Sequence, residues 1–403
     1  MIILNKGQQE VSDAAVKWFN NSSDRLFQFD GKAGTGKSVV LNDIVRRLNL
    51  TQEQVLPMAF TGQAAIVMRT KGMVGACTCH SGLFEPVEEV IIDKDTGKPV
   101  MDEQFNVPLT SLKFVPKSFF GSPIRLIIID EGWTVPKSFR PFIEATGIKT
   151  IVAGDSGQLP PIAEEPGYLV GGRIYHLTEL MRQSSDSPLI YLANLAREGK
   201  KIDVGTYGNV RVIYEDDLVD SMFVNSEIVL CGKNITREKI NNYVRHDIRH
   251  IDTDFPCYGE RLICRKNNWK KELDGISLAN GLVGTVMKPP SIERFVANKE
   301  LVIDFKPDLL DRCFEDLVIN YDYLNIIGDP KTKEYMKKSK YVRGELMEYA
   351  YGSTVHLAQG SEYSTGMYFE EYLHPDTQSN LNYTAITRFK QNMVYVKRRP
   401  KMW

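Results

Sequence analysis

The spacing of hydrophobic residues predicts alternating strands and helices in the first part of the chain. Residues 26–30 (LFQFD) have the length of a strand, and apolar residues recur at helical spacing across residues 39–48. Two further runs, residues 126–129 and 150–153, are short and largely aliphatic. Such continuous runs are typical of central strands in a parallel sheet, because helices cover both of its faces. The pattern therefore predicts an α/β fold.

The second part of the chain repeats this pattern. Residues 227–231 predict a strand, and residues 237–249 predict a polar helix whose apolar residues recur at every fourth position. We infer a second α/β domain, joined to the first near Gly171-Gly172.

Two segments between these strands and helices predict β-structure of another kind. Residues 87–92 and the residues from 100 onward surround a polar turn at residues 93–99, which predicts a hairpin. A surface loop without a function is the alternative for this segment. Short apolar segments broken by Asn280-Gly281 predict further hairpins within residues 258–286.

Composition narrows the class of protein. The chain has 403 residues, which suffices for two or three domains, and its 50 Lys and Arg balance 51 Asp and Glu. The net charge therefore does not indicate a nucleic-acid-binding protein, and a nucleic-acid strand could bind only in a locally basic groove. Six cysteines without regular spacing favour the reducing cytoplasm over a secreted scaffold. No aliphatic run approaches the ~20 residues of a membrane helix, so we expect a soluble protein with no membrane contact.

Residues 31–38 (GKAGTGKS) carry the first chemical signal. The string matches G-x-x-x-x-G-K-[ST] and lies between a predicted strand and a predicted helix, where backbone N–H groups can wrap a phosphate chain. Lys37 is expected to reach the β and γ phosphates, and Ser38 is expected to hold magnesium. The remaining loop residues expected to contact the nucleotide are Gly31, Ala33, Gly34, Thr35 and Gly36.

Two acidic residues directly follow the aliphatic run at residues 126–129. A phosphate-transfer site needs carboxylates for its metal and for the attacking water, and Asp130 and Glu131 supply them at the end of a buried strand. Asp130 is expected in the magnesium shell and Glu131 beside the water. A solvated acidic turn is the alternative, and the nearby phosphate-binding loop makes it the weaker one.

A third strand, residues 150–153, leads into residues 154–161 (GDSGQLPP), which place Gln158 where a γ phosphate would end. This string resembles motif III of the superfamily-one helicases, particularly the RecD-like and Dda-like branch. Further segments resemble other motifs of that superfamily in the same order along the chain. They are residues 4–8 (LNKGQ), 60–65 (FTGQAA), 78–81 (TCHS), 177–183 (LTELMRQ), 354–362 (TVHLAQGSE) and 383–388 (YTAITR).

The resemblance implies two RecA-like P-loop domains with parallel sheets, a β-hairpin pin and a small β-barrel insert. The first RecA-like domain is expected at residues 1–83 and 122–172, and the pin at residues 84–121. The second RecA-like domain is expected at residues 173–250 and 341–403, and the barrel at residues 251–340. The compact layout with two inserts is similar to that of phage-encoded members, which would place the protein in the host cytoplasm.

The resemblance also implies roles for single residues. Residues 4–8 resemble the motif that contacts the adenine, and this motif supplies Gln8. Residues 354–362 resemble motif V, which supplies Gly360 and Glu362 beside the nucleotide. Arg182 and Arg388, which singly would be taken for surface arginines, are expected to stabilise the γ phosphate together with Lys37 and Gln158, while Glu131 activates the water. The residues expected to contact single-stranded DNA are Thr61, Gln63, His80, Thr354 and His356.

The sequence departs from the pattern of this superfamily in three places. Leu357 stands where a basic residue is common, Gly132-Trp133 replaces a small residue and serine, and Phe389 replaces alanine. These differences leave the expected ATPase chemistry intact and bear on how strongly the chain holds its strand.

Together these residues predict an ATP- and Mg²⁺-dependent DNA helicase. Its expected partners are single-stranded DNA, fork DNA and replication proteins, and its expected roles lie in DNA replication and recombination. Both arginines lie in one chain, so a monomer would suffice. The 5′-to-3′ direction rests on the resemblance alone. An RNA translocase with the same chemistry and a nucleotide-switched binding protein remain as alternatives, because backbone contacts do not select DNA over RNA unless a 2′-hydroxyl is bound.

Overall fold

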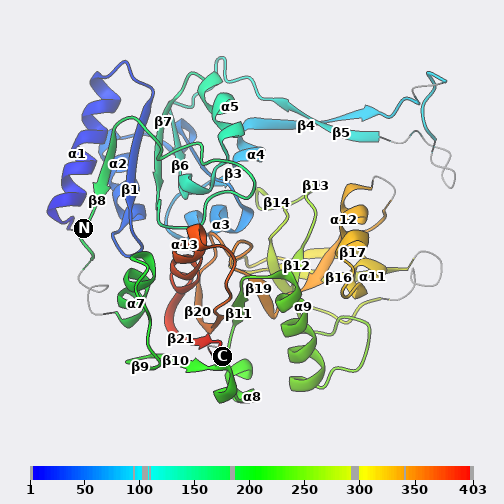
Figure 1. The fold of residues 1–403 in the computed structure, drawn as a ribbon. Coiled ribbons are helices and arrows are strands. Elements are labelled where there is room, and N and C mark those ends of the chain that lie inside the picture. Colours follow the sequence, from blue (N-terminus) through cyan, green and yellow to red (C-terminus); the bar gives the residue numbers. More distant parts are fainter. Residues whose placement is uncertain are drawn as a thin grey trace.

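Two parallel sheets, a barrel and a protruding hairpin make up the molecule (Figure 1). The computed structural model describes residues 3–93, 96–101, 108, 110–181, 187–291, 299–339 and 342–399. The α/β class with two parallel sheets is the one that the hydrophobic pattern predicts.

The first sheet contains six parallel strands in the order β3-β2-β6-β7-β1-β8. Its strands are β1 (Leu26–Gly31), β2 (Val55–Ala59), β3 (Cys77–Thr78), β6 (Leu126–Ile129), β7 (Lys149–Gly154) and β8 (Ile174–Leu177). All four residues of β6 are buried between β2 and β7, which confirms the aliphatic run as a central strand. Asp130 and Glu131 follow it directly, so the fold delivers both carboxylates to one edge of the sheet.

Helices cover this sheet on both faces (Figure 1). They are α1 (Lys6–Asn21), α2 (Lys37–Leu48), α3 (Gly62–Thr70), α4 (Cys79–Leu83) and α5 (Arg140–Ala145). Short 3₁₀ turns lie at Gln52–Gln54, Gly132–Thr134 and Lys137–Phe139. Helix α1 begins with a capping box, in which Asn5 accepts from the Gln8 amide and the Gln8 side chain accepts from the Asn5 amide.

The second sheet has the order β19-β11-β20-β21-β10-β9, and only β9 runs antiparallel to its neighbour. Its strands are β9 (Gly205–Tyr207), β10 (Val210–Tyr214), β11 (Ile228–Cys231), β19 (Gly352–Thr354), β20 (Tyr363–Phe369) and β21 (Phe389–Lys397). Its helices are α7 (Pro188–Arg197), α8 (Asp220–Val224), α9 (Asn234–Asn242) and α13 (Pro375–Ile386), with a 3₁₀ turn at Glu215–Asp217 and a π-helical turn at Tyr243–Ile248.

The insert within the second half is a five-stranded antiparallel sheet in the order β17-β16-β15-β12-β18. A bridge between Ile319 and Glu345 joins its two edges, so the sheet closes into the expected small barrel. The strands are β12 (Arg261–Cys264), β15 (Val283–Val286), β16 (Glu300–Pro307), β17 (Phe314–Asn320) and β18 (Met347–Tyr349), and helices α11 (Tyr321–Asn325) and α12 (Pro330–Lys338) follow β17.

The domain boundaries differ from those predicted near residues 172 and 340. Strand β8 lies beyond residue 172 but pairs with β1, so the first sheet extends to Leu177. Strand β18 lies beyond residue 340 but pairs with β12, so the barrel extends to Tyr349. Both shifts arise because a short edge strand leaves little signal in the sequence.

The predicted hairpin at residues 84–121 is present, but with other strands. Strands β4 (Phe84–Val90) and β5 (Thr110–Pro116) pair along seven residues, so the returning strand begins at residue 110 rather than at residue 100. An isolated antiparallel bridge between Ile92 and Pro99 flanks the turn expected after residue 92. The hairpin extends away from the body of the protein (Figure 1).

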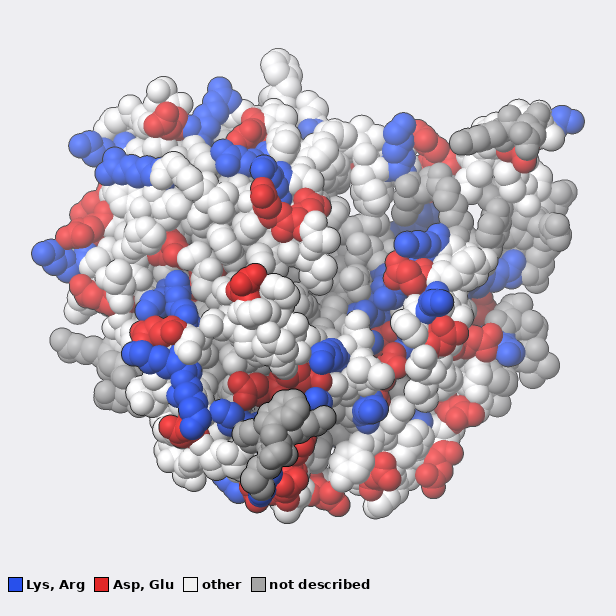
Figure 2. Space-filling view, in the orientation of Figure 1, with Lys and Arg blue, Asp and Glu red and all other residues white. Residues whose placement is uncertain are grey.

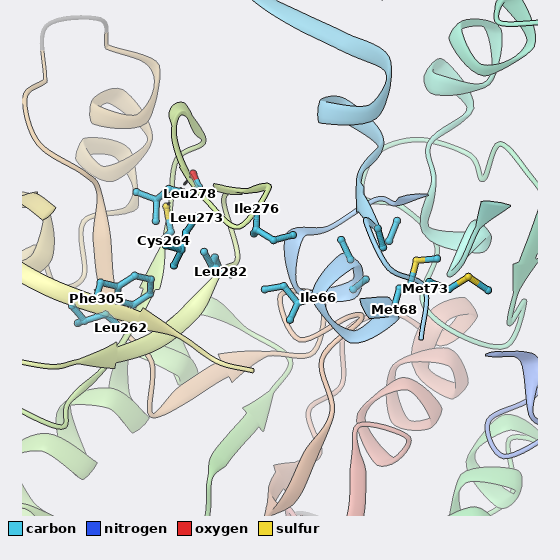
Figure 3. Close-up of a cluster of buried hydrophobic side chains, with 14 of the residues drawn as sticks. Ile66, Met68, Met73, Leu262, Cys264, Leu273, Ile276, Leu278, Leu282 and Phe305 are labelled. Atoms are coloured by element: carbon cyan, nitrogen blue, oxygen red, sulfur yellow. Dashed lines mark hydrogen bonds between the residues drawn. The ribbon is translucent and has the colours of Figure 1, made fainter. Parts of the chain in front are cut away.

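The hairpin predicted at Asn280-Gly281 is wrong. Strand β14 (Ile276–Leu278) pairs with β13 (Asn268–Leu273) through a turn at Asp274-Gly275, whereas β15 belongs to the barrel. The Ile276 side chain of this small hairpin points toward Ile66 of α3 in the first half (Figure 3). Arg69 of α3 also donates to the carbonyls of Asp274 and Gly275, so the insert is joined to the first sheet's helices.

Two surface properties bear on the expectations from composition. Acidic and basic side chains are interspersed on the face shown in Figure 2, in line with the totals of 51 and 50. Within the described residues, the helices are all too short or too polar to cross a membrane.

The barrel core predicts a stability difference between two phenylalanines. Phe305 is fully buried beside Leu262 (Figure 3), whereas Phe120 is 99% exposed. We expect Phe305→Ala to lower the free energy of unfolding by about 3–5 kcal/mol, because the truncation leaves a cavity. Phe120→Ala should change it by less than about 0.5 kcal/mol. Urea unfolding followed by circular dichroism measures both, and equal effects would contradict the barrel core.

Candidate active site

The phosphate-binding loop lies between β1 and α2, as predicted. Gly34 and Gly36 have φ values of +83° and +81°, a region that glycine adopts without strain. A Cβ atom at Gly36 would also lie 2.5 Å from the side-chain nitrogen of Gln8. The loop can therefore turn its backbone N–H groups toward an anion at the start of α2.

Lys37 and Thr35 shape this loop from within. The Lys37 ammonium donates to the carbonyl of Gly31 at 2.7 Å, which places the cation across the loop. The buried Thr35 hydroxyl donates to the Lys32 carbonyl at 2.8 Å. A phosphate chain in the loop would therefore meet a positive charge and several N–H donors.

A cavity of about 810 Å³ opens beside this loop and is lined from both sheets. From the first half it receives Ala33, Gly34, Gly36, Lys37, Ser38, Asp130, Glu131 and Gln158. From the second half it receives Gly360, Glu362 and Arg388. The structure thus brings together in one cleft most of the residues expected to contact the nucleotide.

Glu131 lines this cleft in a left-handed backbone conformation, with φ of +52°. Its Oε2 accepts a hydrogen bond from the Gln158 amide at 3.1 Å. Burial raises the pKa of Glu131, while the nearby charges of Arg388 and Lys37 lower it. A carboxylate with a raised pKa is suited to accept a proton near neutral pH.

One end of the Gln158 side-chain amide remains available to bind a water or a ligand. Its nitrogen binds Glu131 and its backbone carbonyl accepts from the Trp133 indole at 3.0 Å. Its Oε1 atom is buried without a hydrogen-bond partner among the described residues. An acceptor beside the base carboxylate can orient an attacking water, which adds to the expected contact with the γ phosphate.

Asp130 and Ser38 meet the requirements of a magnesium site that is completed by phosphates. Both line the cleft, and one Asp130 oxygen already accepts from the Glu131 amide at 2.9 Å. Magnesium is commonly held by one or two carboxylates together with substrate phosphates. No cluster of three or more His, Cys, Asp or Glu side chains suited to a metal occurs in the described residues. The Asp130 carboxylate and the Ser38 hydroxyl stay the predicted protein ligands.

Arg388 reaches the cleft from the second half. Its guanidinium is buried and donates to the carbonyls of Thr384 and Ser361 at 3.1 and 3.3 Å. These bonds fix the charge opposite Lys37 and Glu131. Arg182 lies outside the described residues, so its role stays a prediction.

Gln8 is placed differently from expectation. It does not line the cavity, and both ends of its amide are used within the protein, by the Asn5 amide and by the Thr35 carbonyl at 2.9 Å. Gln8 therefore supports the phosphate-binding loop in this structure. Gly31 and Thr35 likewise shape the loop and lie outside the cavity lining.

Gly360 and Glu362 connect the halves beside the cleft. A Cβ atom at Gly360 would lie 2.6 Å from that of Ala64 in α3, so only glycine permits this approach. Glu362 forms ion pairs with Lys71 at 2.5 Å and Lys390 at 2.6 Å. Burial alone would raise the pKa of Glu362, but these two cations lower it to about 2.

The residues expected to contact single-stranded DNA lie on several elements of the fold. The Thr61 hydroxyl caps α3 by accepting from the Ala64 amide, and the Thr354 hydroxyl accepts from the Leu357 amide at 3.4 Å. Burial lowers the pKa of both His80 and His356, so both rings are neutral near pH 7.

His80 and Gln63 have surroundings that the sequence did not indicate. The His80 ring lies 4.6 Å from the ring of Phe139 and 5.4 Å from that of Trp269, which joins α4 to the insert. Gln63 is buried and lines a second cavity of about 580 Å³, and its Oε1 has no hydrogen-bond partner in the part of the chain that the structure describes. The contact of Gln63 with a strand therefore stays a prediction.

Several residues that shape the site were not singled out from the sequence. Tyr383 lies within the segment YTAITR, yet only its arginine was selected. Lys71, Lys390 and Phe139 belong to no recognised pattern, because their roles arise from contacts between distant segments. Spacing along one chain does not reveal such contacts.

The ion pairs of Glu362 predict a pH-dependent stability. Because its pKa is lowered to about 2 from the usual 4.5, the paired carboxylate stabilises the fold above about pH 4.5 and loses this effect as the pH falls toward 2. We expect Glu362→Gln to lower the unfolding free energy by about 1–2 kcal/mol at pH 7, a value reduced for partial exposure. Glu165 forms an exposed ion pair with Lys137, so Glu165→Gln is the control variant and should have almost no effect on the unfolding free energy. A Glu362→Gln effect that persists unchanged near pH 3 in urea unfolding would contradict the pairing.

Comparison with known proteins agrees with this geometry. A family model described as AAA domain matches residues 3–216. The ATP-dependent DNA helicase RRM3 of Saccharomyces cerevisiae (strain ATCC 204508 / S288c) is 24% identical over 387 residues, covering 86% of this chain and 49% of the yeast protein. The chain thus spans about half the length of this relative.

Three solved structures share the fold over nearly the whole chain. A structure of two coordinating Pif1 helicases at forked double-stranded DNA has a TM-score of 0.56 and 18% identity, with 98% of this chain and 92% of the other covered. Pif1 helicase from Bacteroides with ADP-AlF3 and single-stranded DNA gives 0.55 and 19%, with the same coverage. Pif1 helicase from Candida albicans gives 0.54 and 16%, with 98% and 94% covered.

The family model covers more than half of the chain, and the three solved structures share its fold over nearly its whole length. The chain belongs to the AAA domain family, and its fold is that of the solved Pif1 helicases, as the resemblance to superfamily-one helicases implied.

Proposed function

We propose that this chain is an ATP-dependent DNA helicase that moves along single-stranded DNA, in the 5′-to-3′ direction, and separates duplex DNA. One observation carries the proposal. A single cleft joins a phosphate-binding loop, an acidic pair on a central strand and an arginine from a second sheet. Phosphoryl transfer from ATP requires this set, and placing its members on two sheets links hydrolysis to motion of the halves.

In the proposed reaction the loop amides and Lys37 bind the β and γ phosphates. Glu131 accepts a proton from the attacking water, and the unpartnered Gln158 oxygen orients that water. Arg388, and Arg182 as predicted from the sequence, stabilise the charge that develops on the γ oxygens. Ser38 and Asp130 would hold Mg²⁺, which would supply positive charge to the phosphate oxygens.

Strand contact is proposed for Thr61, Gln63, His80, Thr354 and His356. Thr61 caps α3, and three residues of that helix, Ala64, Val67 and Met68, line the nucleotide cleft. Gly360 approaches the same helix from the second half. A change in the shape of the nucleotide cleft would therefore be transmitted to the bound DNA strand through α3. The neutral ring of His80, set among aromatic side chains, offers a stacking face for a base.

The proposal extends to partners and compartment. Fork DNA and replication proteins are the proposed partners, with roles in DNA replication and recombination and a phage as the proposed origin. One chain supplies all residues of the proposed site, which supports action as a monomer. All six cysteines are free thiols, which suits a reducing cytoplasm, that of the host for a phage protein.

Two substitutions test the nucleotide site. We expect Lys37→Ala and Glu131→Gln each to lower the rate of ATP hydrolysis at least about 100-fold, since each removes a charge used in the transition state. Glu131→Gln should retain ATP binding, because the loop is unchanged. The control Glu198→Gln alters an exposed surface pair and should hydrolyse ATP normally. Steady-state hydrolysis and nucleotide binding measure these effects, and robust turnover in either site variant would refute the assignment.

The hairpin formed by β4 and β5 is proposed to be the pin that splits the duplex. Deleting residues 93–99 removes its predicted tip and leaves the paired strands intact. We expect DNA-stimulated hydrolysis to persist in this variant while strand separation of a tailed duplex falls at least about tenfold, because the wedge that stops the second strand is gone. Unwinding at the full rate would remove the pin assignment.

A further inference from the structure

A tyrosine hydroxyl links the phosphate-binding loop to the second half of the protein. Tyr383 lies in α13 with 1% of its surface exposed. Its hydroxyl accepts a hydrogen bond from the Ala33 amide at 2.9 Å and donates one to a carboxylate oxygen of Asp155. One oxygen atom therefore contacts the loop after β1 and the loop after β7.

Asp155 fixes the direction of this hydroxyl. The carboxylate is fully buried, and its other oxygen accepts from the Gly157 amide at 3.0 Å and from Arg197 of α7 at 2.9 Å. The Arg197 guanidinium also lies 5.3 Å from the centre of the Tyr383 ring. Burial and the charge of Asp155 raise the pKa of Tyr383, so its proton stays on oxygen and points at the carboxylate. The oxygen lone pairs are then free to accept from Ala33.

The same helix also holds the loop that carries Gln158. Asn380 donates to the carbonyls of Gly157 and Gln158 at 2.9 and 3.1 Å, and the Thr384 hydroxyl accepts from the Leu159 amide at 2.9 Å. The loop that positions Glu131 through Gln158 is thus fixed to α13 along one side. Tyr383 adds the phosphate-binding loop to this set.

We propose that Tyr383 is a positioning residue that sets the phosphate-binding loop in register with Glu131 and Gln158 only while the second half is docked. Its hydroxyl makes hydrolysis depend on closure of the cleft, in addition to the charge that Arg388 supplies. This inference rests on the proposed ATP hydrolysis, and it assigns Tyr383 no contact with the nucleotide.

Tyr383→Phe tests the proposal, because it removes the hydroxyl and keeps the ring beside Arg197. Tyr168→Phe is the matched control: Tyr168 is equally buried, but its hydroxyl has no hydrogen-bond partner among the described residues. We expect Tyr383→Phe to lower kcat for DNA-stimulated ATP hydrolysis about tenfold with KM within about twofold, since positioning acts on the chemical step. Tyr168→Phe should leave both within about twofold of the unaltered protein.

Hydrogen exchange supplies a second readout that does not depend on activity. The peptide containing Ala33 should exchange faster in Tyr383→Phe than in the unaltered chain, and Tyr168→Phe should leave it unchanged. If Tyr383→Phe fails to fold, Asp155→Asn keeps the shape of the carboxylate, removes its charge and should show the same split between kcat and KM.

Normal kcat in Tyr383→Phe would overturn the inference, whether or not exchange is faster. A rise in KM alone would also overturn it, since the hydroxyl would then serve nucleotide binding. Failure of the proposed function is distinct, because it would appear in the unaltered protein as absent ATP hydrolysis.

Discussion

Burial of carboxylates between the two sheets is the constraint on which the site depends. Taking a charged carboxylate out of water costs several kcal/mol unless partners replace the solvent. Asp155 and Glu131 both belong to the first half, yet Arg197, Tyr383 and Arg388 come from the second. The first half therefore completes its electrostatic environment only when the second half packs against it. A nucleotide site built in this way responds to the relative position of the halves.

Helix α3 connects this site to the other end of the molecule. Its residues line the nucleotide cleft, its capping Thr61 is a proposed strand contact, and Arg69 binds the turn of the β13–β14 hairpin. Gly360 contacts the same helix from the second half. A displacement of α3 would therefore move the lining of the cleft, the proposed contacts with single-stranded DNA and the insert together.

Features that arise from local sequence could be predicted, and those that arise from contacts between distant segments could not. The buried strand at residues 126–129 and the loop at residues 31–38 are set by neighbouring residues, so pattern and spacing identified both. The turn at Asn280-Gly281 was misassigned because a glycine turn predicts a reversal but not which strand pairs after it. Tyr383 was overlooked because its two partners lie far away in the sequence.

Dependence of ATP hydrolysis on single-stranded DNA tests the central claim most directly. Steady-state hydrolysis would be measured with no nucleic acid, with single-stranded DNA and with an RNA of matched sequence, and with Lys37→Ala as the background. We predict strong stimulation by DNA that vanishes in that variant, because the proposed DNA contacts at Thr61 and Gln63 and the nucleotide cleft share α3. Stimulation by RNA alone would identify an RNA translocase. Hydrolysis indifferent to either strand would contradict the account and favour a nucleotide-switched binding protein.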